Sequence, residues 1–186
     1  MKALRLFPKL VIAVGIIFAL GGLGTAGAGI YIRSFVGDQL AAQHIVTPDD
    51  ASIPNAPVTG IATALSMADI IQYHAADSSD GLSYAQMGRF AVESGAAAGT
   101  SNADEAKKDA NGKPVANQAR NTQLTAAGLV TSLSLSAMAI GASYGAIALG
   151  IGFLVLGIVI AGLGYALLGL ITPEVAKRFG LHPVAE

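Results

Sequence analysis

The residues of this sequence that could bind a metal are its histidines and one pair of adjacent carboxylates. The histidines are His44, His74 and His182, and Asp49-Asp50 closely follows the first of them. Two histidines with a carboxylate can hold iron, and three protein ligands can hold catalytic zinc. A long apolar stretch separates His182 from the other two, so the three are not expected in one site. We favour the alternative that His74 lies on an amphipathic helix and that Asp49-Asp50 forms a turn or a helix cap.

Other sequence patterns that would indicate chemistry are missing. The chain has no cysteine, which excludes disulfides, thiolate metal sites and covalent attachment of c-type haem. No glycine-rich phosphate loop follows a strand, and no nucleophile elbow is present. No basic patch with interleaved aromatic residues suggests nucleic acid. The sequence therefore predicts a chain that is not an enzyme, holds no cofactor or metal and binds no nucleic acid.

The composition is typical of a membrane protein. Hydrophobic residues make up 53% of the chain and charged residues only 12%, and the mean hydropathy is +0.58. Soluble domains carry about 25% charged residues. Residues 10–32 and 121–173 contain no charge, and each stretch reaches the roughly 20 residues that cross a bilayer. We predict an all-α membrane protein with transmembrane helices over residues 10–32 and 144–171, with Tyr144 and Tyr165 at opposite headgroup layers.

A secretory signal peptide is the alternative interpretation of the first apolar stretch. A basic start, an apolar core and Ala26-Gly27-Ala28 together resemble such a peptide and its cleavage site. The apolar run, however, continues past the supposed cut through Ile30, Tyr31 and Ile32. We therefore expect this stretch to be a retained transmembrane helix.

The distribution of charge predicts the topology. Residues 1–9 contain three basic residues and no acid, and the tail over 172–186 contains Lys177 and Arg178 against Glu174 and Glu186. Residues 33–120 contain six basic and ten acidic residues. Because basic residues accumulate on the cytoplasmic side, both termini are predicted to be cytoplasmic and residues 33–120 external. The chain is thus predicted to be a multi-pass protein of the plasma (cell) membrane.

Two short helices are predicted in the external segment. Ser66 with Asp69 resembles a capping box that opens a helix over residues 67–76, and Ser83 with Gln86 repeats this pattern for residues 84–93. Two helices this short cannot form a core alone, so their apolar faces need cover from the chain or from a partner. The candidate partner contacts on them are Ile70, Ile71, His74, Tyr84 and Phe90.

A flexible loop and a long helix are predicted to follow. Residues 95–114 are small and polar, as in flexible loops. A helix is expected from about Val115, with residues 121–143 external or interfacial. In a three-span alternative, residues 125–142 cross separately and the tail lies outside. Small residues four positions apart let helices approach closely in lipid. The helix-packing candidates with this spacing are Gly15, Gly22, Ala26, Gly141, Gly145, Gly152, Gly157 and Ala161.

Four parts of the chain carry a resemblance to known proteins. They are the run His44-Ile45-Val46-Thr47-Pro48-Asp49-Asp50-Ala51, the pair Ala68-Asp69-Ile70-Ile71 and His74-Ala75, the pattern Gly81-x-Ser83-Tyr84-Ala85, and the Ser/Thr-rich entry into a glycine-rich last helix. In these parts the chain resembles a family of small actinobacterial membrane proteins with two spans, many of them labelled aromatic ring-opening dioxygenases. Residues 95–114 are longer than the family pattern. A ring-opening dioxygenase needs an iron site, and this chain offers no suitable set of ligands.

The resemblance also implies a role. Some members or close analogues of the family look like accessory subunits of the actinobacterial respiratory supercomplex of cytochrome bc and cytochrome c oxidase, where they carry no redox centre. We therefore expect a non-catalytic accessory subunit, with membrane lipids and subunits of cytochrome bc and cytochrome c oxidase as partners. The alternatives are a free-standing envelope protein or sensor, a metal-dependent enzyme using the external histidines, and a small transporter or channel along the stripe of Thr131, Ser132, Ser134 and Ser136.

Overall fold

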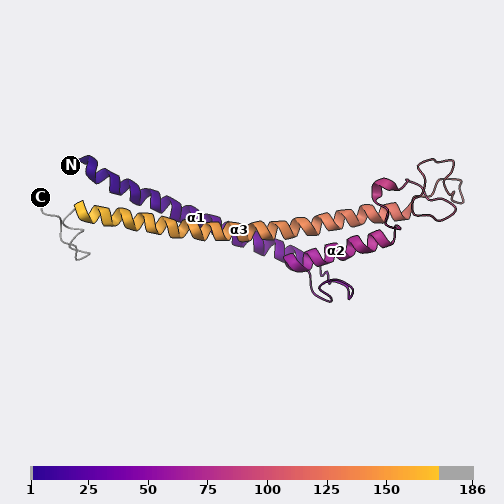
Figure 1. Cartoon of the computed structure of the whole chain (residues 1–186), viewed down its shortest axis with the longest axis horizontal. Coiled ribbons are helices and arrows are strands. Elements are labelled where there is room, and N and C mark those ends of the chain that lie inside the picture. Colours follow the sequence, from indigo (N-terminus) through magenta and orange to yellow (C-terminus); the bar gives the residue numbers. More distant parts are fainter. Residues whose placement is uncertain (1, 172–186) are drawn as a thin grey trace. The chain divides into compact units, whose positions relative to one another are not determined.

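The structure is a computed structural model that describes residues 2–171, and every regular element in that range is helical. The elements are α1 over Lys2–Ala42, α2 over Ile61–Asp77, the 3-10 helix η1 over Tyr84–Gln86, and α3 over Gln118–Ile171 (Figure 1). α1 and α3 contain stretches long and apolar enough to cross a membrane, with mean hydropathies of 2.2 and 2.7. The prediction of an all-helical chain with two long apolar helices is therefore confirmed. The predicted tail, residues 172–186, lies outside the described residues.

α3 is a single helix of 54 residues. It passes through residues 125–142 and 144–171 without a turn between them. A separate crossing by residues 125–142 would need a reversal of the chain, so the three-span alternative does not agree with this structure. The helix begins at Gln118, three residues later than the predicted start near Val115.

The chain divides into two compact units, to which α1 and α3 both contribute. Unit 1 consists of residues 1–35 and 141–186, and unit 2 consists of residues 36–140. Unit 2 has a small core in which alanines of α2 meet larger residues of α3. Small side chains on α2 allow the two helices to pack closely, while leucine and isoleucine fill the remaining space. The core residues are Leu40, Val58, Ala64, Ala68, Leu133, Ala137 and Ile140.

α2 begins six residues before the predicted start at Met67. The hydroxyl of Thr63 accepts hydrogen bonds from the backbone N–H groups of Thr59 and Gly60, which satisfies donors at the true helix start. Ser66 is not a cap but a buried residue inside the helix. Its hydroxyl accepts the backbone N–H of Ile53 at 2.9 Å and so ties the irregular segment before α2 to the helix.

The second predicted helix, over residues 84–93, is wrong beyond its first turn. Gln86 does accept the backbone N–H of Ser83 at 2.9 Å, as the capping pattern predicts, but only η1 forms. The chain then turns to extended backbone at Met87. Phe90 exchanges two hydrogen bonds of 2.9 Å with Thr100 instead of forming helical ones. Pairing between distant segments therefore replaces the local helix.

Asn117 holds this paired region together. It is buried, with 4% of its surface exposed, and its side-chain amide donates to the carbonyls of Gly88 at 3.1 Å and Ala97 at 2.8 Å. It also lies directly before the first residue of α3, where its backbone carbonyl accepts the N–H of Asn121. Residues 95–114 are thus attached to the rest of unit 2 by backbone pairing and by this one side chain, and they contain no helix.

Asn117→Ala should loosen residues 88–100 by about 1–3 kcal/mol, because two buried carbonyls lose their donor and α3 loses a capping residue. Amide hydrogen exchange of the intact protein measures the effect, with faster exchange expected at Phe90 and Thr100 and little change at Ala64 in the core. Asn121→Ala, an exposed position one turn into α3, is the matched control. Equal exchange in the two variants would contradict the role assigned to Asn117.

Candidate functional site

Unit 1 contains an antiparallel pair of helix segments, from α1 and α3, that meet along buried glycines. On α1 the buried glycines are Gly15, Gly22 and Gly29, at intervals of seven residues. On α3 the matching buried positions are Ser143, Gly150, Gly157 and Gly164, again seven residues apart. Gly15 meets Gly157, Gly22 meets Gly150 and Gly29 meets Ser143. We call these levels of contact the glycine seam.

The backbones of the two helices touch at the seam. A Cβ atom added to Gly22 would lie closer than 3.0 Å to the backbone of Gly150, and one added to Gly150 would lie equally close to Ala26. The same holds for Gly157 against Ala19 and for Gly15 against Ala161. No residue with a side chain fits at these positions without moving a helix, so glycine is required by close approach. The seam continues at Gly164, which faces Ile12 and Pro8.

Five of the eight predicted helix-packing residues lie in the seam, and three do not. Those in the seam are Gly15, Gly22, Ala26, Gly157 and Ala161. Gly141, Gly145 and Gly152 are exposed, and nothing lies within 4 Å of a Cβ added to Gly145 or Gly152. The seam residues that the spacing of four missed are Gly29, Gly150 and Gly164. The seam positions share a period of seven on both helices, which keeps one face of a helix turned to an antiparallel neighbour. Gly145 and Gly152 have the same period, so it does not by itself select the seam face.

Arg33 and Tyr144 lie beside the last level of the seam, next to Gly29 and Ser143. The guanidinium Nε donates to the Tyr144 hydroxyl at 2.8 Å, and its Cζ lies 5.3 Å from the ring centroid. Both residues are exposed. The contact combines a hydrogen bond with a cation–π interaction, and the sequence alone did not indicate that these two residues meet.

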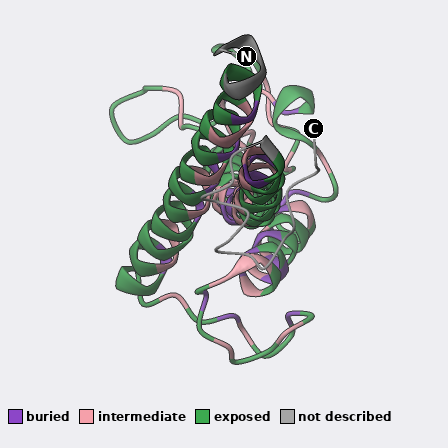
Figure 2. Cartoon of the chain, turned by 90° about the vertical axis from the view of Figure 1, so that its left-hand side faces the viewer, coloured by how far each residue is buried: buried purple, intermediate pink, exposed green. Residues whose placement is uncertain are grey.

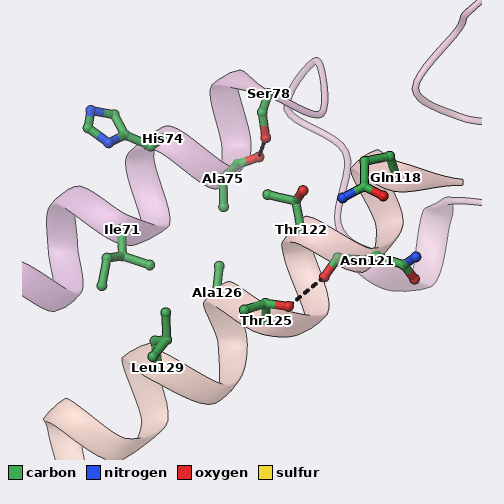
Figure 3. Close-up of a pocket in the computed structure, with 10 residues that line it drawn as sticks. All are labelled: Ile71, His74, Ala75, Ser78, Gln118, Asn121, Thr122, Thr125, Ala126 and Leu129. Atoms are coloured by element: carbon green, nitrogen blue, oxygen red, sulfur yellow. Dashed lines mark hydrogen bonds between the residues drawn. The ribbon is translucent and has the colours of Figure 1, made fainter.

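A groove lies between α2 and α3 within unit 2 and has a volume of 580 Å³ (Figure 3). Apolar side chains, Ile71 from α2 and Ala126 and Leu129 from α3, face one another across it. Hydroxyl and amide groups line its other end, towards the start of α3. Its lining residues are Ile71, His74, Ala75, Ser78, Gln118, Asn121, Thr122, Thr125, Ala126 and Leu129.

A second hollow of 390 Å³ shares Ile71 and Leu129 with the groove. Ser132 and Ser136 line it, but both hydroxyls donate to carbonyls four residues earlier in α3. These bonds satisfy the hydroxyl protons inside the helix. The two hollows offer apolar contact and hydrogen bonding and, in their linings, no carboxylate.

His74 and Asp50 form a hydrogen-bonded pair at the edge of the groove, with 2.7 Å between Nε2 and Oδ2. Both side chains are about half exposed, so the pair contributes little to stability. The part of the chain that the structure describes brings together no group of three histidine, aspartate or glutamate residues that could hold a metal ion. His44 lies in a turn with φ of 52° and takes no part in the His74 pair.

The remaining candidate partner contacts are not equally accessible. Ile70 is buried, with 8% of its surface exposed, so it is not accessible to a partner in this structure. Ile71 is half-buried in the groove, and Phe90 is half-buried in the backbone pairing with Thr100. Tyr84 is exposed on one side and carries the guanidinium of Arg120 on its ring, 3.8 Å from the centroid.

No protein-family model, curated protein or solved structure matches this chain. The resemblance described from the sequence therefore stays an expectation.

Gly22→Ala and Gly150→Ala should each weaken the helix pair by about 1–3 kcal/mol, because a methyl group forces the touching backbones apart. Energy transfer between dyes on cysteines introduced at Leu20 and Leu156, both exposed, would report separation during titration with a denaturing detergent. The chain has no native cysteine to compete for the dyes.

Gly24→Ala and Gly152→Ala are the matched controls, since a Cβ at either position meets nothing within 4 Å. They should leave the midpoint of separation unchanged. A shift as large in the controls as in the seam variants would contradict the assignment of the seam.

Proposed function

We propose that this chain is a non-catalytic membrane subunit, with α1 and α3 as its two transmembrane helices, that packs on and stabilises a larger membrane complex. The observation that carries the proposal is the apolar outer surface of the glycine-packed pair. Most of the surface of the long helices is exposed (Figure 2). Large exposed apolar side chains in unit 1 include Ile16, Ile17, Leu20, Leu23, Leu149, Ile151, Val155, Ile158 and Leu163.

Such a surface is unfavourable in water and suits lipid. Burying apolar surface is worth about 25 cal/mol per Å², so a pair of helices this exposed would associate or aggregate in water. In a bilayer the same side chains lie among acyl chains, while every backbone group of the helix is satisfied internally. We propose residues 10–32 and 144–171 as the spans, with both termini cytoplasmic and residues 33–120 external.

The seam also supports a retained first helix. A signal peptidase cut after Ala28 would remove Gly15 and Gly22, and α3 would lose its packing partner at both levels. Gly150 and Gly157 would then face lipid and would lose the close backbone contacts with α1 that require glycine at these positions. The proposed protein therefore keeps its N-terminal helix in the mature state.

An unused stripe of small residues supports a partner helix. Gly141, Gly145 and Gly152 of α3 are exposed, and so is Ala148 between them. A Cβ added to Gly145 or Gly152 would meet nothing within 4 Å. Small residues along one face are typical of surfaces where a second helix approaches in lipid. We propose that a helix of the host complex packs here.

The respiratory supercomplex of cytochrome bc and cytochrome c oxidase is the host that we propose to test first. The resemblance to accessory subunits of that complex motivates this choice. A subunit of this kind needs no cofactor of its own, because it contributes packing and not chemistry. A free-standing envelope protein or sensor is the second outcome of the test.

The test is a pull-down of the tagged chain in mild detergent, analysed by mass spectrometry and by haem absorbance of the eluate. We expect cytochrome bc and oxidase subunits, with haem, at a fixed ratio to the chain. Gly145→Ile combined with Gly152→Ile should lower this ratio about tenfold, because two bulky residues at a helix contact cost roughly 1–3 kcal/mol. Gly162→Ile, an open position outside the stripe, should leave it unchanged. A colourless eluate holding the chain alone would refute the supercomplex as host.

A further inference from the structure

We propose that Arg33 and Tyr144 form a binding site for the phosphate group of an anionic phospholipid. The inference rests on the proposed function only in its first step, the insertion of α1 and α3 into a bilayer. It adds a ligand, a headgroup phosphate, to a pair of residues that the packing of the helices brings together. Both residues belong to unit 1, beside the last level of the glycine seam.

The Tyr144 ring and hydroxyl hold the guanidinium of Arg33 in one orientation. Nε is engaged by the hydroxyl at 2.8 Å, and the Cζ stands 5.3 Å from the ring centroid. Arg33 is an exposed residue. The N–H groups of its two terminal nitrogens form the planar fork that matches two oxygens of a phosphate. An arginine fixed in this way loses less conformational entropy when it binds than a free one would.

Among the described residues of unit 1, no carboxylate competes for Arg33. Residues 2–35 and 141–171 contain two lysines and two arginines and no aspartate or glutamate. Asp38, the next acidic residue along α1, lies within 4.0 Å of no basic nitrogen in the described residues, where the one such contact joins His74 to Asp50. Within the described residues the guanidinium thus has no carboxylate partner, and an anion from outside the chain would complement its charge.

The length of the charge-free stretch places this charge at headgroup depth. Residues 10–32 separate Lys9 from Arg33. These twenty-three residues rise about 35 Å as a helix, close to the roughly 30 Å of the hydrocarbon layer with some tilt. Arg33 then lies at the surface opposite Lys9. Ile30 and Tyr31, with 59% and 68% exposed, precede it towards the apolar stretch and offer contact to the acyl chains below the headgroup.

The test measures lipid binding to the full-length chain by native mass spectrometry after delipidation in detergent. Dioleoyl phosphatidylglycerol is the probe, and dioleoyl phosphatidylcholine tests the preference for an anionic headgroup. We expect phosphatidylglycerol to bind more tightly than phosphatidylcholine. Arg33→Gln should weaken the binding of phosphatidylglycerol about tenfold, because one charge-assisted contact is lost. Tyr144→Phe keeps the ring but not the hydroxyl, so it should weaken binding by a smaller factor and remains informative should Arg33→Gln not fold.

Arg89→Gln is the matched control. Arg89 also lies over an aromatic ring, at 5.4 Å from the Phe90 centroid, but in unit 2 and outside the apolar stretches. It should retain full binding. Wild-type affinity in Arg33→Gln, an equal loss in Arg89→Gln, or displacement of the lipid by an equal concentration of inorganic phosphate would each overturn the proposal. Extraction of the chain from membranes and the pull-down test the proposed function without measuring lipid binding. Failure of the lipid-binding proposal is therefore distinguishable from failure of the proposed function.

Discussion

Contact between the backbones of α1 and α3 is the constraint on which unit 1 depends. Apolar side chains gain nothing by leaving lipid for another apolar surface, so helices in a bilayer associate through close packing and not through the hydrophobic effect. The seam supplies that packing at Gly15, Gly22, Gly150 and Gly157, where no Cβ keeps the helices apart. The larger side chains are thereby turned outward, where the proposed membrane location would place them against lipid.

The surface left by this packing supports the structural role that we propose. The features on the outside of unit 1 are an apolar surface, an open stripe at Gly145 and Gly152, and the Arg33–Tyr144 pair. Unit 2 adds a groove whose lining offers apolar and hydrogen-bonding contact without a carboxylate. Each of these features can bind a helix, a lipid or an apolar group. The role that we propose, packing on a larger membrane complex, would use them in this way.

Sequence reasoning finds the long helices because charge and length act locally. The absence of charge over residues 10–32 and 121–173 is enough to predict two long apolar helices. The seam is found only in part. Gly145 and Gly152 are seven residues apart, just as Gly150 and Gly157 are, so the sequence does not reveal which face meets α1. That choice depends on the rotation of both helices, which the side chains of the pair determine jointly.

The errors in unit 2 have a different cause, which is competition from distant partners. Ser66 resembles a cap in the sequence, yet its hydroxyl is used by Ile53, thirteen residues earlier. Phe90 lies in a segment whose sequence predicts a helix, but in the structure it forms two backbone hydrogen bonds with Thr100 instead. Short segments have little intrinsic helical stability, so a few tertiary bonds decide their conformation. The groove is also beyond sequence reasoning, because it depends on how α2 lies along α3.

Disulfide crosslinking in native membranes tests the antiparallel, glycine-packed pair most directly. The Phe18 and Phe153 rings meet edge to face, with centroids 5.8 Å apart, and the cysteine-free chain permits single pairs to be introduced. Phe18→Cys with Phe153→Cys should crosslink rapidly within one chain in the membrane fraction, whereas Phe18→Cys with Ile160→Cys, one seam level away, should not. Preferred crosslinking of the second pair, or recovery of the chain in the soluble fraction, would contradict the account.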